Sequence, residues 1–373
     1  MIRGASPRPI KDKKWFDSNS TIGWIRISDV TAQNGRIHHL SQHISKLGQQ
    51  KTRVVIQPHL LLSIAASVGY PVINYIPTGV HDGFLIFNNP NFMIDYGFYW
   101  LEKYQTSWKK YGQPGSQVNL NSNIVSNTKI NLPSLNEQSD IIAIFKQVSK
   151  IISLQQRKLD LLKQLKKGLL QKLFADKDAK QPVLRFDGFS GDWEQRKLGE
   201  ISTSFSGGTP SVKNKSYYGG KIPFIRSAEI HKNKTELFIT ESGLKNSSAK
   251  LIRKGTLLYA LYGATSGEVD VSNIDGAINQ AIMAIFLQKD NVSFIKYYLE
   301  KNKDKIIAKY LQGGQGNLSA SIIKSVYINL PFTEEQLKIS NLIKKVESLI
   351  SLQQSKLDKL TFLKNFLLQQ MFI

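Results

Sequence analysis

Residues 130–174 have the sequence INLPSLNEQSDIIAIFKQVSKIISLQQRKLDLLKQLKKGLLQKLF, and residues 328–372 have the sequence INLPFTEEQLKISNLIKKVESLISLQQSKLDKLTFLKNFLLQQMF. The two stretches align without a gap at an offset of 198 positions, which places Pro133 onto Pro331. About half of the aligned positions are identical, so we interpret the pair as an internal duplication. The chain is therefore predicted to consist of two tandem halves that end in the same element.

Each copy has the pattern of a long amphipathic helix. Ser134 with Glu137, and Thr333 with Gln336, have the spacing of a capping box at the two helix starts. Apolar residues three or four positions apart predict one stripe on each helix. The stripe consists of Ile141, Phe145, Val148, Ile152, Leu159, Leu162, Leu165, Leu169 and Leu173 in the first copy, and of Ile339, Ile343, Val346, Ile350, Leu357, Leu360, Leu363, Leu367 and Met371 in the second.

At about 1.5 Å per residue, some 40 helical residues extend roughly 60 Å. A small globular domain cannot cover a stripe of that length, so the two helices are predicted to pair with each other as a coiled coil. Gln155 and Gln353 interrupt the stripe at matching positions, as a polar residue does when it fixes the register. The alternative is that each helix packs on its own domain.

The stretches before the two helices are long enough for globular domains and are only weakly alike. Short runs of Ile, Val, Tyr and Phe between Gly, Asn and Pro predict strands and turns, and one further helix per half is expected at 96–111 and 294–310. We therefore predict an α+β fold with repeated organisation. Its segments are a first domain at 1–133, a long helix at 134–176, a linker with the second domain at 177–331, and a second long helix at 332–373.

Composition favours nucleic acid as the partner. The sequence has 50 Lys and Arg against 28 Asp and Glu, a formal net charge of +22, and such a surplus favours polyanion binding. A hydrophobic fraction of 41% excludes wholesale disorder. The absence of cysteine excludes disulfides, thiolate metal sites and thiol catalysis. No apolar run approaches about 18 residues and no signal-peptide pattern follows Met1, so we expect a cytoplasmic protein.

Motifs for catalysis and for metal or cofactor binding are absent or weak. The chain lacks a phosphate-binding Gly-x-x-x-x-Gly-Lys-Ser/Thr loop. Residues 89–92 depart at their third position from an amino-methyltransferase motif, so a turn is favoured. His39 and His43 have metal-binding spacing on a helix but lack a third ligand, which favours a solvated pair. Asp82 and Asp275, each before a glycine, are interpreted as turn residues. No catalytic, cofactor or metal site is predicted.

Residues suited to contact DNA lie at comparable places in the two halves. Exposed backbone N–H groups, hydroxyls and lysines can hold phosphates, and Arg, Gln and Asn can form paired hydrogen bonds with base edges. For Arg26 and Arg226 the alternative is an ion pair with a nearby carboxylate inside the fold, because each sits in an apolar strand, where a buried arginine needs a partner. The predicted contacts are Arg3, Arg8, Lys13, Arg26, Ser28, Gln113 and Gln117 in the first half, and Ser206, Gly207, Gly208, Thr209, Lys213, Arg226, Ser227, Gln312 and Gln315 in the second.

The chain resembles the specificity subunits of type I restriction-modification systems over nearly its whole length. The resemblance rests on the segment DWEQRKLGEI at 192–201, on GGTP at 207–210, on WIR at 24–26, and on INLP before each Glu-Gln helix. Each motif alone is weak, but their combination and order are specific.

The resemblance implies two dissimilar target-recognition domains, each followed by a similar long helix, with the helices paired as an antiparallel coiled coil. It implies a non-catalytic subunit that binds an asymmetric, bipartite site in double-stranded DNA. The implied partners are two modification subunits, which bring S-adenosylmethionine and methylate flipped adenines, and restriction subunits that translocate and cleave DNA. No cofactor is expected on this chain itself. The alternatives are a stand-alone basic scaffold that binds nucleic acid through charge alone, and an enzyme with an unrecognised site.

One departure from that family concerns the first domain. The second domain is preceded by residues 184–205, whereas the first begins almost at once with Arg3-Gly4-Ala5-Ser6-Pro7. Either the true start lies upstream, or the first domain is a shortened variant. We expect the first domain to be the less stable of the two.

Overall fold

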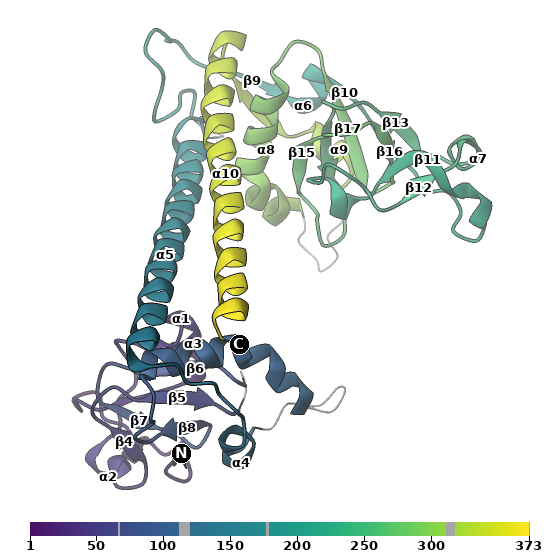
Figure 1. The fold of residues 1–373 in the computed structure, drawn as a ribbon. Coiled ribbons are helices and arrows are strands. Elements are labelled where there is room, and N and C mark those ends of the chain that lie inside the picture. The colour runs from purple at the N-terminus through teal and green to yellow at the C-terminus, as the bar shows by residue number, and fades with distance from the viewer. Residues whose placement is uncertain (66–67, 112–119, 177–178, 311–317, 373) are drawn as a thin grey trace. The chain divides into compact units, whose positions relative to one another are not determined.

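The structure is a computed structural model that describes residues 1–65, 68–111, 120–176, 179–310 and 318–372. It contains two compact units, one formed by residues 1–157 with 354–373 and the other by residues 158–353. Each unit holds one α+β domain and a stretch of both long helices, which are α5 (Leu135–Lys172) and α10 (Thr333–Met371) (Figure 1).

The domain of the first unit has its central strands buried on both faces. Leu60 and Leu62 of β5 belong to one apolar core, together with α3, and Leu61 between them belongs to a second core on the other face. Within the described residues the sheets have the strand orders β1-β8-β5-β6-β3 and β2-β7-β4. The elements are β1 (Ile2–Arg3), β2 (Gly23–Trp24), α1 (Ile27–Ala32), β3 (Arg36–Ile37), α2 (Lys46–Gln49), β4 (Arg53–Val55), β5 (Leu60–Ser63), β6 (Pro71–Asn74), β7 (Thr78–Val80), β8 (Phe84–Phe87), α3 (Ile94–Tyr104), the 3-10 helix at Gln105–Tyr111, and α4 (Ser122–Ser126).

The domain of the second unit repeats this layering. Leu257 and Tyr259 of β14 face the core that contains α8, and Leu258 and Ala260 face the opposite core. Within the described residues the sheets are β10-β17-β14-β15, β12-β11-β16-β13 and β18-β9. The elements are β9 (Glu194–Lys197), α6 (Leu198–Ile201), β10 (Ser202–Ser206), β11 (Tyr218–Ile225), β12 (Phe238–Ile239), α7 (Glu241–Lys245), β13 (Lys250–Ile252), β14 (Leu257–Ala260), β15 (Val269–Val271), β16 (Gly276–Ile278), β17 (Ile282–Leu287), α8 (Val292–Tyr310), α9 (Ala320–Lys324) and β18 (Tyr327–Leu330).

The two long helices run in opposite directions within each unit. In the first unit the beginning of α5 lies beside the end of α10, with the rings of Phe145 and Phe372 5.8 Å apart. In the second unit the end of α5 lies beside the beginning of α10, where Lys166 Nζ is 2.8 Å from the Glu347 carboxylate. The predicted pairing and the antiparallel direction implied by the resemblance are therefore confirmed (Figure 1).

Most of the predicted stripe lies in the interior. Of the 18 stripe residues, eight are buried and eight are partly buried. The buried ones are Ile141, Phe145, Leu159, Leu173, Ile339, Ile343, Val346 and Leu357, and the partly buried ones are Val148, Ile152, Leu162, Leu169, Ile350, Leu360, Leu367 and Met371. The assignment of Leu165 and Leu363 to the stripe was wrong, since both are exposed. The inward position is taken by the next residue, Lys166 or Lys364, whose ammonium group is neutralised by a glutamate.

A buried glutamine joins each domain to the helix that follows it. Gln138 of α5 donates to the Pro133 carbonyl at 3.0 Å and accepts a hydrogen bond from the Met93 N–H group, at the start of α3, at 2.9 Å. Gln336 of α10 makes the same two bonds, to the Pro331 carbonyl at 3.0 Å and from the Asn291 N–H group at 2.9 Å. All three positions in the second set are 198 residues beyond those in the first.

The same domain helix also contacts the second long helix of its unit. In the first unit Lys364 pairs with Glu102 at 2.6 Å, Lys103 donates to the Phe372 carbonyl at 2.5 Å, and the rings of Phe372 and Tyr96 are 5.0 Å apart. The contacts at the matching positions of the second unit are Lys166 with Glu300 at 2.5 Å, Lys301 with the Phe174 carbonyl at 2.7 Å, and Phe174 with Phe294 at 4.8 Å. Each domain is thus attached to both helices, so helix pairing and packing on a domain coexist.

The two helix starts differ from the predicted capping boxes. Ser134 Oγ accepts a hydrogen bond from the Glu137 N–H group at 3.3 Å, as expected. At the second start, Gln336 does not reach back to the cap but is buried and bonded to Pro331 and Asp290. The side chain of Gln336 therefore attaches the domain to α10 and does not take part in the predicted capping box.

The two domains differ most at residues 184–205, which have no counterpart in the first half of the sequence. In the second domain β9 pairs antiparallel with β18, and Trp193 and Leu198 are buried beside it. Residues 129–132, which match β18, have no strand assignment, and Leu132 is exposed. The lower stability of the first domain stays a prediction.

We expect Gln138→Ala and Gln336→Ala each to lower the free energy of unfolding by about 2 kcal/mol, because each leaves a buried N–H group and a carbonyl without a partner. Urea unfolding followed by circular dichroism would measure the loss. Gln164→Ala, an exposed site on α5, is the control. Equal unfolding midpoints for the buried and exposed variants would contradict the proposed attachment.

Candidate nucleic-acid interface

Each domain places a short glycine-containing loop directly after an edge strand of a sheet. Residues 4–7 (Gly-Ala-Ser-Pro) follow β1, and residues 207–210 (Gly-Gly-Thr-Pro) follow β10. The loops are held by the same main-chain bonds: Gly4 N and Ala5 N donate to Phe84 O and Val80 O at 2.8 and 2.9 Å, and Gly207 N and Gly208 N donate to Ile282 O and Ile278 O, both at 3.2 Å. The two loops therefore occupy equivalent positions.

These loops need glycine because another main-chain segment passes very close to them. A Cβ atom on Gly4 would lie 2.1 Å from the His81 carbonyl oxygen, and one on Gly207 would lie 2.0 Å from the Ile278 carbonyl oxygen. The close approach also occupies the amides of Gly207 and Gly208. The expectation of exposed N–H groups at these two residues was therefore wrong, and hydroxyl and lysine side chains remain the predicted phosphate contacts there.

The hydroxyl in each loop is bonded to a side chain of the neighbouring turn. Ser6 Oγ donates to Asp82 at 2.6 Å, and Thr209 Oγ1 donates to Gln280 at the matching position. Arg8 also pairs with Asp82 at 2.6 Å, and Arg3 Nε donates to the Asp82 carbonyl at 2.7 Å. Burial alone would raise the pKa of Asp82, but the Ser6 hydrogen bond and the Arg8 charge outweigh it and lower the pKa. Asp82 thus lies in the predicted turn and also holds two predicted DNA contacts, Arg3 and Arg8.

Arg26 is held in place by groups on two segments. Its Nε and Nη2 atoms each donate to the Asp29 carboxylate at 3.2 Å, and Nη2 also donates to Ser41 Oγ at 2.6 Å. The main-chain N–H group of Arg26 donates to Asp29 as well, at 2.9 Å. The hydrogen bond that Arg26 donates to Asp29 is the main cause that raises the pKa of Arg26.

Arg226 has the same arrangement in the second domain. Its Nε and Nη2 atoms donate to Glu229 at 3.0 and 3.1 Å, and Nη2 reaches Glu236 at 3.4 Å. Burial would raise the pKa of Glu229, but the Arg226 guanidinium and further hydrogen bonds, including one from Thr235, lower it to about 2. The carboxylate therefore stays ionised and holds the arginine.

The sequence left two interpretations of these arginines, a base contact or a buried ion pair, and neither describes them completely. The ion pairs exist, but the carboxylates are the less exposed partners, with Asp29 partly buried and Glu229 buried, while the side chains of Arg26 and Arg226 remain 44% and 43% exposed. Within the described part of the chain, Nη1 of each arginine forms no hydrogen bond. Each domain thus presents a fixed guanidinium with two N–H groups free for a base or a phosphate.

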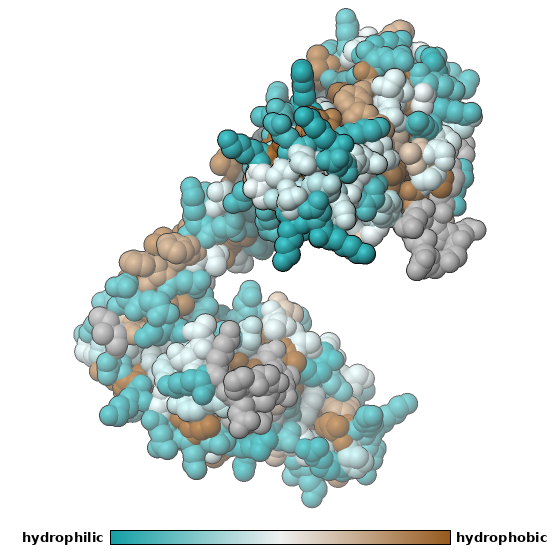
Figure 2. All heavy atoms as spheres, turned by 90° about the vertical axis from the view of Figure 1, so that its right-hand side faces the viewer, coloured by the Kyte–Doolittle hydropathy of each residue, from teal (hydrophilic) through white to brown (hydrophobic). Residues whose placement is uncertain are grey.

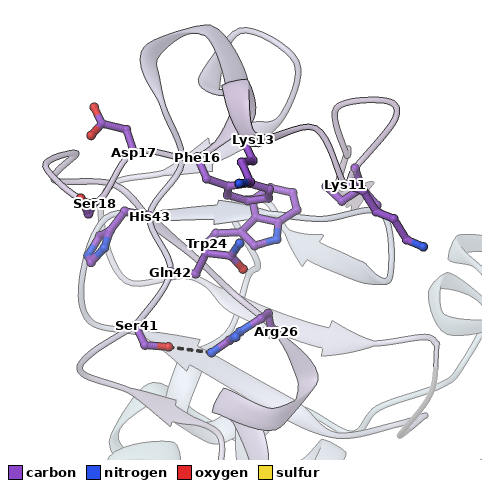
Figure 3. A pocket seen from close by; sticks show the side chains of 11 residues that line it. Lys11, Lys13, Phe16, Asp17, Ser18, Trp24, Arg26, Ser41, Gln42 and His43 are labelled. Carbon is purple, nitrogen blue, oxygen red and sulfur yellow. Dashed lines mark hydrogen bonds between the residues drawn. The ribbon is translucent and has the colours of Figure 1, made fainter.

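A pocket of about 760 Å³ lies beside Arg26 in the first domain (Figure 3). Trp24 and Phe16, whose rings meet edge to face at 6.1 Å, form part of its wall. Lys11, Lys13 and Gln42 add polar groups, and the hydrogen bond from Arg26 to Ser41 runs along one side. The combination of lysines, an exposed arginine and aromatic rings suits a nucleic-acid ligand.

The other predicted contacts fall in three groups. Ser28, Thr209 and Lys213 are exposed, and Ser206 and Ser227 are partly buried. Gln113, Gln117, Gln312 and Gln315 lie outside the described residues. Sequence reasoning missed Asp29, Ser41, Glu229 and Gln42, although an acidic residue three positions after each arginine was a visible signal.

The described residues give no support to a metal site or to a membrane-spanning helix. They contain no cluster of three or more His, Asp or Glu residues suited to a metal ion. His39 and His43 lie outside helices, so the helical spacing considered for them does not exist. Among the helices described, none has the length and apolarity needed to cross a bilayer.

Comparison with known proteins points to one family. Residues 4–164 and 190–361 match the family model for the type I restriction modification DNA specificity domain. Among curated proteins, the chain is 33% identical over 170 residues to the type I restriction enzyme MjaIX specificity subunit of Methanocaldococcus jannaschii, which covers 43% of the chain and 39% of that protein. It is 25% identical over 259 residues to the putative MjaX specificity subunit of the same organism, covering 66% of the chain and 58% of that protein. These alignments span less than two thirds of the length of either relative.

The fold has a solved counterpart. The crystal structure of the type I restriction-modification system S subunit from M. genitalium superposes with a TM-score of 0.62 at 14% identity, covering 97% of this chain and 91% of that one. At this identity the likeness concerns the fold alone.

The low pKa of Glu229 predicts a pH-dependent stability of the second domain. The carboxylate has a usual pKa of 4.5 and one of about 2 in the folded chain, so its stabilising effect is full above about pH 4.5 and is lost as the pH falls towards 2. Glu229→Gln should therefore destabilise the chain at pH 7 but progressively less below pH 4.5. Thermal unfolding from pH 7 to pH 2.5 measures this, with Glu241→Gln, an exposed site of the same domain, as control. A deficit that does not change with pH would contradict the ionised pair.

Proposed function

The chain belongs to the family of type I restriction modification DNA specificity domains, and on that premise we propose that it is the sequence-specific DNA-binding subunit of a type I restriction-modification complex. The observation that carries this proposal is the pair of equivalent sites, each built from a glycine-containing loop and a carboxylate-held, exposed arginine. A guanidinium fixed in this way loses little side-chain entropy when it binds a base edge or a phosphate.

The target is a bipartite and asymmetric DNA site. The two domains share a scaffold, but the groups beside the shared arginine and loop differ: Ser41 corresponds to Glu236, and Asp82 corresponds to Gln280. Because base recognition depends on donors and acceptors at such positions, each domain recognises a different half-site. The paired helices act as the spacer, with half-sites about one DNA turn, roughly 34 Å, apart. The attachment of each domain to both helices supports this role.

The helix pair also offers a docking surface for modification subunits. In heptad terms the inward a and d positions include Ile141, Phe145 and Ile152, and the e positions, such as Leu170 and Leu368, are buried in the domain cores. The g and c positions lie on the other side of the seam. They carry exposed apolar residues: Ile151, Leu154, Leu363 and Phe366 in the first unit, and Leu349, Leu352, Leu165 and Leu161 in the second.

Three of these exposed residues recur at the 198-residue offset, as Ile151 with Leu349, Leu154 with Leu352, and Leu165 with Leu363. Exposed apolar patches on an otherwise hydrophilic surface, of the kind that Figure 2 shows on one face, indicate protein contacts. One such patch in each unit supports two equivalent modification subunits. They would bring S-adenosylmethionine and flip and methylate the adenines, while restriction subunits would cleave, and this chain would bind no cofactor and act in the cytoplasm.

The proposed function is tested by reconstitution. The purified chain with S-adenosylmethionine should neither methylate nor cleave DNA, and its modification subunits should methylate a defined site only when the chain is added. Methylation by the chain alone would overturn the non-catalytic assignment. The charge-only scaffold predicts instead equal competition by all DNA sequences with a steep salt dependence.

The docking surface gives a separate prediction. Leu352→Lys should leave one modification subunit bound and the double variant Leu154→Lys/Leu352→Lys none, since each removes the centre of one apolar patch. Light scattering of the purified complex measures the stoichiometry, and circular dichroism checks that the helices persist. Gln164→Lys, on an exposed outer face of α5, serves as the control. Two subunits bound to the double variant would place the docking surface elsewhere.

A further inference from the structure

We infer that Gln42 selects an A·T base pair in the first half-site, by placing its side-chain amide in the pocket beside Trp24 and Arg26. The inference rests on the proposed function and deepens it, because it assigns one residue to the sequence preference of one domain. Gln42 has an equivalent position in the second domain, its main chain is held in place, its side-chain amide is available, and the chemistry of its pocket suits a base edge.

The main-chain bonds identify the equivalent position. Trp24 N donates to Gln42 O at 2.7 Å, and Phe224 N donates to Leu237 O at 2.8 Å. The preceding residues agree, because Ser41 and Glu236 accept hydrogen bonds from Arg26 and Arg226. Gln42 and Leu237 therefore occupy the same place beside the same arginine. Leu237 packs on the core around Phe224, so only the first domain presents a polar side chain here.

The main chain around Gln42 is held on both sides. Its carbonyl is bonded to Trp24, Ser41 is bonded to Arg26, and the buried Ile44 donates its N–H group to Ile22 O at 2.9 Å. Only the side-chain torsions of Gln42 remain free. Its position relative to the pocket is thus set before a ligand binds, which lowers the entropic cost of recognition.

The amide of Gln42 is available in the pocket. Within the residues that the structure describes, its side chain forms no hydrogen bond, and it is partly buried at the pocket wall. Two other polar neighbours are engaged: Ser41 Oγ accepts from Arg26, and Asp17 accepts from the Asn19 N–H group at 2.9 Å. His43 also lines the pocket, but the two nitrogens of an imidazole point apart and cannot pair with neighbouring atoms of one base. Figure 3 shows these side chains around the pocket.

The chemistry of the pocket fits the major-groove edge of adenine. A glutamine amide accepts a hydrogen bond from adenine N6 and donates one to N7, in one plane. Lys11 and Lys13 line the same pocket and can contact the flanking phosphates, and Trp24 offers an apolar surface to the thymine methyl group. At about 760 Å³ the pocket is large enough to admit the edge of a base pair.

Mapping of methylated adenines tests this assignment. The full chain, wild type or variant, is combined with its modification subunits on a randomised DNA library. Gln42→Ala should reduce the preference for A·T at one position of one half-site by about five- to a hundredfold, the fold-change expected for loss of one paired contact. The isosteric Gln42→Glu, which can only accept hydrogen bonds, should shift that position towards C·G. The other half-site should be unchanged in both variants. Gln50→Ala, an exposed glutamine outside the pocket lining, is the matched control.

The failures of the two proposals are distinguishable. A wild-type complex without any bipartite motif would overturn the proposed function. A normal wild-type motif that Gln42→Ala and Gln42→Glu leave as unaltered as Gln50→Ala does would overturn the role of Gln42 alone. Equal relaxation of both half-sites would also overturn it, because Gln42 lies in one domain. If Gln42→Ala abolishes methylation, the isosteric Gln42→Glu is the deciding variant. A motif shifted towards C·G at that position would support selection by Gln42, and an unchanged motif would assign the loss in Gln42→Ala to a folding defect.

Discussion

The buried glutamine at the start of each long helix is the contact on which the rest of the arrangement depends. Gln138 and Gln336 each bond a proline carbonyl and the first turn of the domain helix, α3 or α8. That same domain helix then meets the other long helix through a Lys–Glu pair and an aromatic pair. A domain bonded to two antiparallel helices cannot turn about either one. Polar groups buried in this way are costly unless every bond is made, so the geometry is well specified.

This rigid attachment separates what is shared between the domains from what differs. The attachment contacts and the arginines held by Asp29 and Glu229 occur in both domains. Next to them the side chains diverge, with Gln42 in one domain and Leu237 in the other. A constant frame with variable groups at its surface allows one architecture to recognise two different DNA sequences. The exposed apolar side of the helix pair is the surface that we propose for the modification subunits.

The sequence predicted the architecture better than the site. The 198-residue repeat and the three-four spacing predicted two long, paired helices, because one long apolar face needs a partner. Periodicity could not give the antiparallel direction, which came from the family resemblance, and it misplaced Leu165 and Leu363 because inward lysines neutralised by glutamates look like surface residues. Gln42 was invisible for a different reason: it matches Leu237 only through main-chain hydrogen bonds, at an offset that differs from that of the helices.

We propose that two unlike domains, each attached to the same pair of helices, recognise the two half-sites of one bipartite DNA site. Sequencing of methylated adenines in DNA from cells that carry the wild-type chain with its modification subunits tests it most directly. We predict one motif made of two unlike half-sites separated by a gap of constant length. A single contiguous motif, two identical half-sites, or half-sites at variable separation would contradict the account.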